Sequence, residues 1–97
     1  MSEWLCILRP PRPTFEEDMT EEEARAMQAH FEYLKGLLAE GKLLLAGPAS
    51  DPLFGVVVLV ADSEAEAWEL ARGDPSVRAG VQTPELQPLR VALLAGR

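Results

Sequence analysis

A chain of 97 residues is long enough for one domain, spanning residues 1–97, with a single hydrophobic core. Apolar residues make up 47% and charged residues 26%, as is typical of a soluble globular protein. The net charge of −7 argues against a nucleic-acid-binding surface, because phosphates are bound by clustered Lys and Arg. The acidic residues gather where two helices are expected to begin, so they favour solubility and helix capping.

The single cysteine, Cys6, lies inside an apolar run and cannot form an internal disulfide. We expect it to be a small buried residue, which fits a reducing cytoplasm. The N-terminus lacks the basic-then-apolar pattern of a signal peptide, and no apolar run approaches the roughly 20 residues that span a bilayer. The sequence therefore predicts a cytoplasmic protein without membrane contact.

The first predicted element is a strand over Trp4–Leu8, a short continuous apolar run. Its proline-rich end at Arg9–Pro13 starts a connection to the next element. Thr20 and Glu23 then have the spacing of a capping box, in which each side chain accepts a hydrogen bond from the other residue's backbone N–H. This pattern predicts a helix from Thr20 to about residue 40.

The helix carries apolar residues at helical spacing, which predicts the stripe that it buries. The stripe consists of Met27, Phe31, Leu34 and Leu38. His30, the only histidine, and Leu37 lie along one edge of that stripe. His30 is therefore expected to be half covered at the border of the core. Gly41 is well placed as the left-handed residue that ends the helix.

Two apolar runs after this helix predict strands over Lys42–Ala46 and Val56–Ala61. The nine residues between them, Gly47–Gly55, form a longer loop than a minimal hairpin needs. The second run is apolar on both alternating faces, which favours a central strand.

A second helix is expected between the capping residue Ser63 and Gly73, with an inward face of Ala67, Leu70 and Ala71. Asp74 and Pro75 can begin a further single turn, with Asp74 as its cap and Pro75 at its first position. Gly80 ends that turn.

The last predicted strand covers Leu89–Leu94, and a start near Thr83 is the alternative. Pro84 and Pro88 exclude it from the centre of a sheet and make it an edge strand. The order strand–helix–strand–strand–helix–strand, with right-handed crossovers and with strands one and three in the centre, predicts an α+β, ferredoxin-like βαββαβ fold. Its sheet has four antiparallel strands.

Two helices can cover only one face of such a sheet, yet both faces are apolar. Leu5 and Ile7 alternate with the other apolar residues of the first strand, and the third strand is apolar throughout. A patch of this size is rare on the surface of a monomer. The sequence therefore predicts a homodimer with its two uncovered sheet faces packed together by two-fold symmetry.

His30 is the first candidate for chemistry, although a lone histidine at the edge of an apolar stripe is often structural. Two Asp-Pro dipeptides supply acids that could orient the ring and stabilise its protonated form, namely Asp51 and Asp74. Asp51 is also explained as a turn residue and Asp74 as a helix cap. On these grounds alone, both acids and both explanations stay open.

Four further residues are candidates for substrate binding: Ser50, Tyr33, Arg9 and Pro48. Tyr33 could line an apolar pocket and Arg9 could bind a carboxylate, while packing and solvated charge are the competing explanations. Ser50 is not part of a nucleophile elbow, so a Ser-His-Asp hydrolase is not expected.

One histidine and one buried cysteine are too few ligands for a metal site, and the glycines form no phosphate-binding pattern. We expect neither a metal nor another cofactor.

The chain contains four motifs with characteristic spacing: Met27-x-x-His30-x-x-Tyr33-Leu34, Gly41-Lys42-Leu43-Leu44-Leu45-Ala46-Gly47-Pro48, Ala61-Asp62-Ser63-x-x-x-Ala67 and Asp74-Pro75-x-Val77-x-Ala79-Gly80-Val81. With these motifs the chain resembles the YciI-like (YCII-related) family. The similarity covers nearly the whole chain, and the motifs come in the family's order. It implies a dimeric α+β barrel, in agreement with the burial argument. The proline-rich connection at Arg9–Pro13 departs from many relatives.

The resemblance also implies a candidate site, a His–Asp pair in a cleft. By motif the histidine corresponds to His30, and Asp74 is the better-matched acid, with Asp51 as the second. Related barrels include muconolactone isomerase-like and dehalogenase-like enzymes, which implies acid–base chemistry on a small metabolite as an isomerase, dehalogenase or lyase. The alternative is a dimer that binds a small ligand or a partner without catalysis. Haem binding, which occurs in some related barrels, is supported by no residue other than His30.

Overall fold

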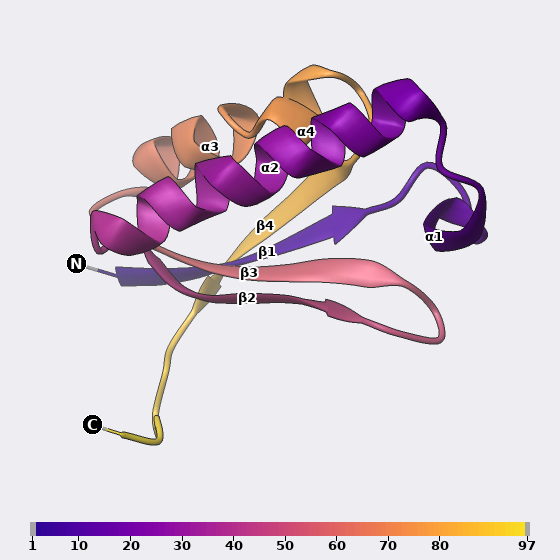
Figure 1. Cartoon of the computed structure of the whole chain (residues 1–97). Coiled ribbons are helices and arrows are strands. Elements are labelled where there is room, and N and C mark those ends of the chain that lie inside the picture. The colour runs from indigo at the N-terminus through magenta and orange to yellow at the C-terminus, as the bar shows by residue number, and fades with distance from the viewer. Residues whose placement is uncertain (1, 97) are drawn as a thin grey trace.

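The computed structural model describes residues 2–96 and contains one antiparallel sheet with helices along one of its faces (Figure 1). The elements in chain order are β1 (Ser2–Arg9), α1 (Phe15–Asp18), α2 (Glu21–Ala39), β2 (Leu43–Ala49), β3 (Phe54–Ala61), α3 (Glu64–Arg72), α4 (Pro75–Arg78) and β4 (Thr83–Leu89). The strand order is β2-β3-β1-β4, with every neighbouring pair antiparallel. The predicted ferredoxin-like α+β fold, with strands one and three in the centre, is therefore confirmed.

The predicted helix signals of α2 are also confirmed. The side chain of Thr20 accepts a hydrogen bond from the backbone N–H of Glu23 at 3.1 Å, and the Glu23 carboxylate accepts one from Thr20 N–H at 2.9 Å. Gly41 follows the helix with a φ of 76°, a left-handed conformation that favours glycine. These local interactions hold α2 at both ends, which places His30 about halfway along it.

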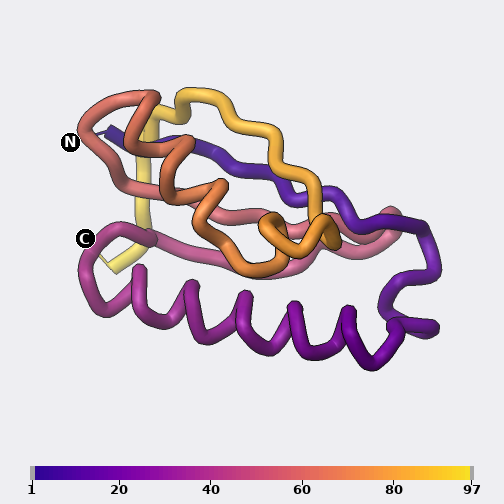
Figure 2. The backbone as a smooth tube through the Cα atoms, turned by 90° about the horizontal axis from the view of Figure 1, so that it is seen from above, coloured from indigo at the N-terminus to yellow at the C-terminus, as the bar shows by residue number. Residues whose placement is uncertain are grey.

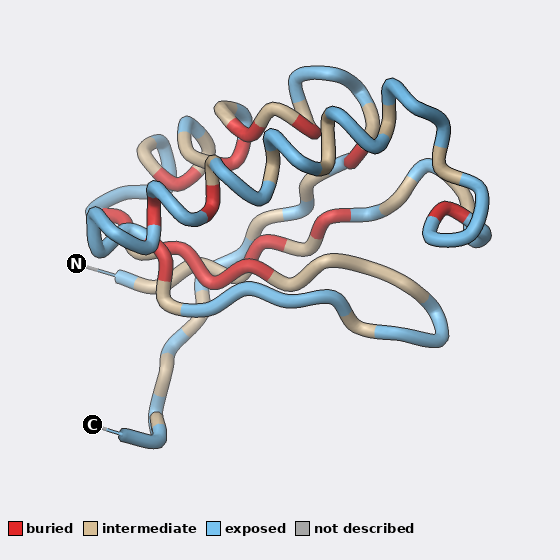
Figure 3. The backbone as a smooth tube through the Cα atoms, in the orientation of Figure 1, coloured by how far each residue is buried: buried red, intermediate tan, exposed pale blue. Residues whose placement is uncertain are grey.

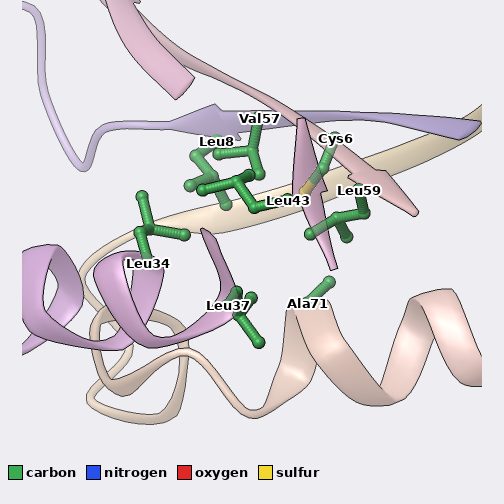
Figure 4. Close-up of a cluster of buried hydrophobic side chains, with 8 residues drawn as sticks. All are labelled: Cys6, Leu8, Leu34, Leu37, Leu43, Val57, Leu59 and Ala71. Carbon is green, nitrogen blue, oxygen red and sulfur yellow. The ribbon is translucent and has the colours of Figure 1, made fainter. Parts of the chain in front are cut away.

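The core lies between the sheet and the helices (Figures 3 and 4). Alternate residues of the central strands point to this side, so that Cys6 and Leu8 of β1 meet Val57 and Leu59 of β3. Leu34 and Leu37 from α2, Leu43 from β2 and Ala71 from α3 complete the cluster. As expected, Cys6 is buried, and burial is the main cause that raises the pKa of its thiol to about 12.

The predicted buried stripe of α2 is wrong at two positions. Phe31 is 61% exposed and Leu38 is 56% exposed, whereas Leu37, expected at the edge, is buried together with Leu34. Viewed from above, α2 runs alongside the β2 edge while α3 and α4 lie over the sheet (Figure 2). Because α2 packs against α4 as well as β2, its inward face is rotated away from Phe31 and Leu38.

The last strand is displaced from the main prediction of Leu89–Leu94. It starts at Thr83, the earlier of the expected starts, and ends at Leu89, as an edge strand. Leu89 pairs with Glu3 near the beginning of β1, so the residues after it have almost no β1 backbone left to pair with. Residues 90–96 therefore leave the sheet on the side away from the helices (Figure 1).

The hairpin between β2 and β3 is longer, and its loop shorter, than the sequence suggested. The ladder continues to the pair of Ala49 with Phe54, which leaves only residues 50–53 as the connection.

A short helix, α1, lies in the segment after β1 that was expected to be a plain connection. Within residues 2–96, no helix is long and apolar enough to cross a membrane.

Candidate functional site

The structure brings His30 of α2 against Asp74, the residue that caps α4. Nδ1 of His30 lies 2.6 Å from Oδ2 of Asp74, across 44 positions of sequence. The Asp74 side chain is 4% exposed and the His30 side chain 13% exposed. Because the neighbouring Ser76 and Leu34 are also buried, little water screens this contact.

The Asp74 carboxylate is held in place by its role as a helix cap. Its Oδ1 accepts hydrogen bonds from the backbone N–H of Ser76 and from the Ser76 hydroxyl, both at 2.8 Å. Pro75 at the first position of α4 has a φ suited to the helix and needs no N–H acceptor. With Oδ1 occupied by two donors, Oδ2 is directed to His30. Capping and pairing with His30 are thus performed by the two oxygens of one carboxylate.

The second ring nitrogen of His30, Nε2, has no hydrogen-bond partner among residues 2–96. No buried side-chain nitrogen or oxygen in this part of the chain lacks a partner, so Nε2 must be accessible. An aspartate that accepts from Nδ1–H leaves Nε2 with a lone pair in the neutral ring. His30 therefore offers a proton acceptor on the side opposite Asp74.

His30 lines an open cleft of about 670 Å³ between α2, the α1 segment and the β2–β3 hairpin. Its walls are mostly apolar, and the exposed Phe31 and Leu38 belong to them. Polar side chains come from four residues only among those that line it: His30, Gln82, Glu16 and Lys35. The size and composition are those of a binding site for a small molecule with a few directed polar contacts.

The other acid considered from the sequence is placed elsewhere. Asp51 lies exposed at the tip of the β2–β3 hairpin and contributes nothing to the wall of the cleft. Ser50 beside it is exposed and is likewise outside the cleft wall, whereas Pro48 lies in that wall. Of the hairpin residues proposed from the sequence, only Pro48 therefore shares a surface with His30.

Tyr33 and Arg9 also lie outside the cleft wall. The hydroxyl of Tyr33 donates to the backbone oxygen of Leu70 at 2.7 Å, and burial is the main cause that raises its pKa. A Cβ atom at Gly73 would be 2.8 Å from this hydroxyl, so glycine permits the close approach. Arg9 pairs with Glu85 at 3.0 Å and stacks over Phe54. In this structure both residues make structural contacts.

Sequence reasoning missed Ser76 and Gln82. The hydroxyl oxygen of Ser76 lies 2.8 Å from Asp74 Oδ1 and 2.9 Å from the Gln82 side chain, and both residues are buried. The position of Ser76, two residues after a capping aspartate, is a usable signal for a bond to that carboxylate. Nothing local to Gln82 indicates that it reaches the same hydroxyl.

Within residues 2–96, no three His, Cys, Asp or Glu side chains are grouped to hold a metal ion.

The family of the chain follows from a match between the YCII-related domain model and residues 4–88. The chain belongs to the YCII-related domain family. The resemblance inferred from its motifs is thereby confirmed.

A curated relative, the uncharacterized protein YjpA of Bacillus subtilis (strain 168), is 45% identical over 51 residues. Those residues are 53% of this chain and 60% of YjpA, so the alignment spans less than two thirds of the relative.

A similar solved structure is that of 5-chloro-2-hydroxyhydroquinone dehydrochlorinase from Burkholderia phenoliruptrix AC1100, in complex with 2,5-dihydroxybenzoquinone. The TM-score is 0.66 and the identity 21%, with 90% of this chain and 93% of the other covered. At this identity the likeness shows a shared fold.

Proposed function

We propose that this protein is a small-molecule enzyme in which His30 is the general acid–base and Asp74 orients it. The observation that carries the proposal is the 2.6 Å contact between Nδ1 of His30 and a buried carboxylate, with an accessible Nε2 on a residue that lines an apolar cleft. A general base needs a lone pair within reach of the substrate and a partner that stabilises its protonated form. Nε2 and Asp74 supply these two requirements.

In the proposed reaction Nε2 takes a proton from an O–H or an acidic C–H group of the bound substrate. The resulting imidazolium is stabilised by the Asp74 carboxylate, which stays ionised. The proton then returns to a different atom of the substrate in an isomerisation. In an elimination it stays on His30 until it passes to water, and the electron pair of the broken O–H or C–H bond forms the new double bond. In loss of HCl, for example, His30 takes the proton and chloride departs with the electron pair of the carbon–chlorine bond.

The comparisons support chemistry of this class. The neighbour of the same fold is named as a dehydrochlorinase and was solved with a quinone ligand. A small cyclic, oxygenated compound of that kind is compatible with a cleft of about 670 Å³. Isomerase, dehalogenase and lyase reactions all use the same proton acceptor, so the proposal covers this group of reactions.

The experiment compares the wild type with His30→Gln and with Gln28→Leu, a control on the exposed surface of α2. Two probes are used: chloride release from 5-chloro-2-hydroxyhydroquinone, and exchange of the ring hydrogens of 2,5-dihydroxybenzoquinone for deuterium. We expect His30→Gln to lower the rate about 100-fold or more, as is typical for loss of a general acid–base. Equal rates in the wild type and His30→Gln would contradict the proposal and favour a binding protein.

We further propose that the enzyme is a homodimer formed through the open face of the sheet. This face is defined by Leu5, Ile7, Leu45, Val56, Val58 and Val60, which alternate with the core residues of β1, β2 and β3. Leu45 is 46% exposed, and Leu93 of the segment that leaves the sheet on this side is 93% exposed. Leu5, Ile7, Val56 and Val60 are partly exposed, and Val58 is buried. An apolar sheet face that stays partly exposed on a single chain favours an interface between two copies.

Light scattering after size-exclusion chromatography tests the dimer. We expect the wild type to have twice the mass of the chain, and Ile7→Lys to be a monomer because it places a charge in the apolar interface. Ala65→Lys, on the exposed surface of α3, serves as the control. A monomeric wild type would contradict the proposal.

A further inference from the structure

A row of hydrogen bonds behind His30 determines which atom of Gln82 faces the cleft. The centre of the row is the Ser76 hydroxyl, in a residue with 0% exposure. Its oxygen lies 2.8 Å from Asp74 Oδ1, 2.9 Å from the side-chain amide of Gln82 at Oε1, and 3.5 Å from Nδ1 of His30. Gln82 and His30 therefore converge on the same hydroxyl.

The Ser76 hydroxyl has one proton but two oxygen neighbours, and it can donate to only one of them. An ionised carboxylate is a stronger acceptor than a neutral amide, so the proton goes to Asp74. Ser76 then has only lone pairs to offer to Gln82. An amide oxygen 2.9 Å away would face these lone pairs with no proton to form a hydrogen bond. A half-turn of the amide, which preserves its shape, places Nε2 there as a donor. The ionised Asp74 thus sets the orientation of Gln82.

The other end of the Gln82 amide is directed outward. Gln82 is 7% exposed and lines the same cleft as His30. Within residues 2–96, no buried side-chain nitrogen or oxygen lacks a partner, so the amide atom that does not contact Ser76 is accessible to solvent, in a residue that lines the cleft. In the orientation set by Asp74 this atom is the amide oxygen. The cleft therefore presents two hydrogen-bond acceptors, Oε1 of Gln82 and Nε2 of His30, and no donor from either residue.

We propose that Gln82 is a specificity-determining residue that selects substrates with two hydroxyl groups. One hydroxyl faces Nε2 of His30 and gives up its proton, and the second donates to Oε1 of Gln82. The remainder of such a molecule is mostly apolar, because the other wall residues are apolar apart from Glu16 and Lys35. The substrate class is a small diol or polyphenol. This inference rests on the proposed function, and Ser76 acts in it as a positioning residue.

The test measures binding to the whole protein by calorimetry. The probes are the three benzenediols (catechol, resorcinol and hydroquinone), each paired with its monomethyl ether, which keeps one hydroxyl and loses the other. We expect the wild type to bind its best diol about three- to tenfold more tightly than the matching ether, the range that one hydrogen bond provides. In Gln82→Leu the two should bind equally, because the second acceptor is absent.

Gln28→Leu is the matched control and should keep the wild-type ratio, since Gln28 is exposed and does not line the cleft. Gln82→Met provides the same test if Gln82→Leu does not fold. In Ser76→Ala the amide is free to turn, so the ratio of the affinities for the diol and for the ether should fall towards one. A wild type without the preference, or Gln82→Leu and Gln82→Met with the full preference, would overturn the inference.

The failure of this inference is distinguishable from that of the proposed function, because the readout is a ratio of affinities and not a rate. A wild type that prefers the diol but shows no turnover dependent on His30 would remove the enzyme proposal and leave the role of Gln82. Turnover dependent on His30 with no preference for the diol would remove the role of Gln82 and leave the enzyme proposal.

Discussion

The chain contains two Asp-Pro dipeptides, and their environments are opposite. Asp51 before Pro52 lies exposed at a hairpin tip in a left-handed conformation, with a φ of 58°. Asp74 before Pro75 has a φ of −64°, is 3% exposed, caps α4 and contacts His30. The same two residues therefore form a turn in one place and a candidate site in the other. The difference comes from the segments that pack against each dipeptide.

The largest effect should come from removing each carboxylate in turn. Asp74→Ala leaves the Ser76 backbone N–H, the Ser76 hydroxyl and His30 Nδ1 without their buried acceptor. We expect it to lower the free energy of unfolding by about 3–5 kcal/mol. Asp51→Ala should cost about 1 kcal/mol or less, since only a turn conformation is affected. Urea unfolding measures both, and equal losses would show that the environments do not differ in energy.

The second effect concerns the proton on His30, and nitrogen NMR resolves it without assignment because the chain has one histidine. In the wild type and in Asp51→Asn we expect the proton on Nδ1. In Asp74→Asn the amide oxygen should take the Oδ1 place, where two donors meet it, and the amide NH₂ group should then face His30. Nδ1 becomes an acceptor and the proton moves to Nε2. The same tautomer in all three proteins would contradict this reasoning.

A third acid, Glu23, extends the comparison of carboxylate environments, because it forms an ion pair with Arg12 near the surface. Arg12 donates two hydrogen bonds to it, at 2.7 and 2.9 Å, and this pairing is the main cause that lowers the pKa of Glu23 to about 2. The unfolded carboxyl titrates near 4.5, so the stabilisation is complete above that pH and is lost as the pH falls towards 2. Glu23→Gln should therefore unfold with a weaker dependence on pH between about 4.5 and 2. Thermal melts across this range give the slope, and an unchanged slope would refute the role of the pair.

The smallest effect is expected for Asp51→Gly. Glycine adopts a φ of 58° without steric cost, so the folded state should tolerate the change. We predict a difference in the free energy of unfolding within about 0.5 kcal/mol of the wild type. Asp74→Gly is the matched substitution and should be as damaging as Asp74→Ala. A large loss from Asp51→Gly would mean that the Asp51 side chain makes a contact that matters for stability.

Much of the fold could be predicted because its signals are short-range. Capping residues such as Thr20 and Glu23 lie within three positions of each other, and their hydrogen bonds form as soon as the helix does. The strand order followed from the element order and from the two prolines of β4, which need an edge position. The end of β4 could not be predicted, because it depends on where β1 begins.

The candidate site could be predicted only in part from the sequence, because it too depends on contacts between distant segments. The amino-acid sequence by itself determined the order of the four strands and the two longer helices, the caps, the position of His30 on α2 and the two acids open to it. Only the tertiary structure decided which acid meets His30, which face of α2 is turned inward, and that Gln82 shares a hydroxyl with Asp74. These features join residues that are far apart in the chain, 44 positions for His30 and Asp74, and no local pattern specifies how such segments pack.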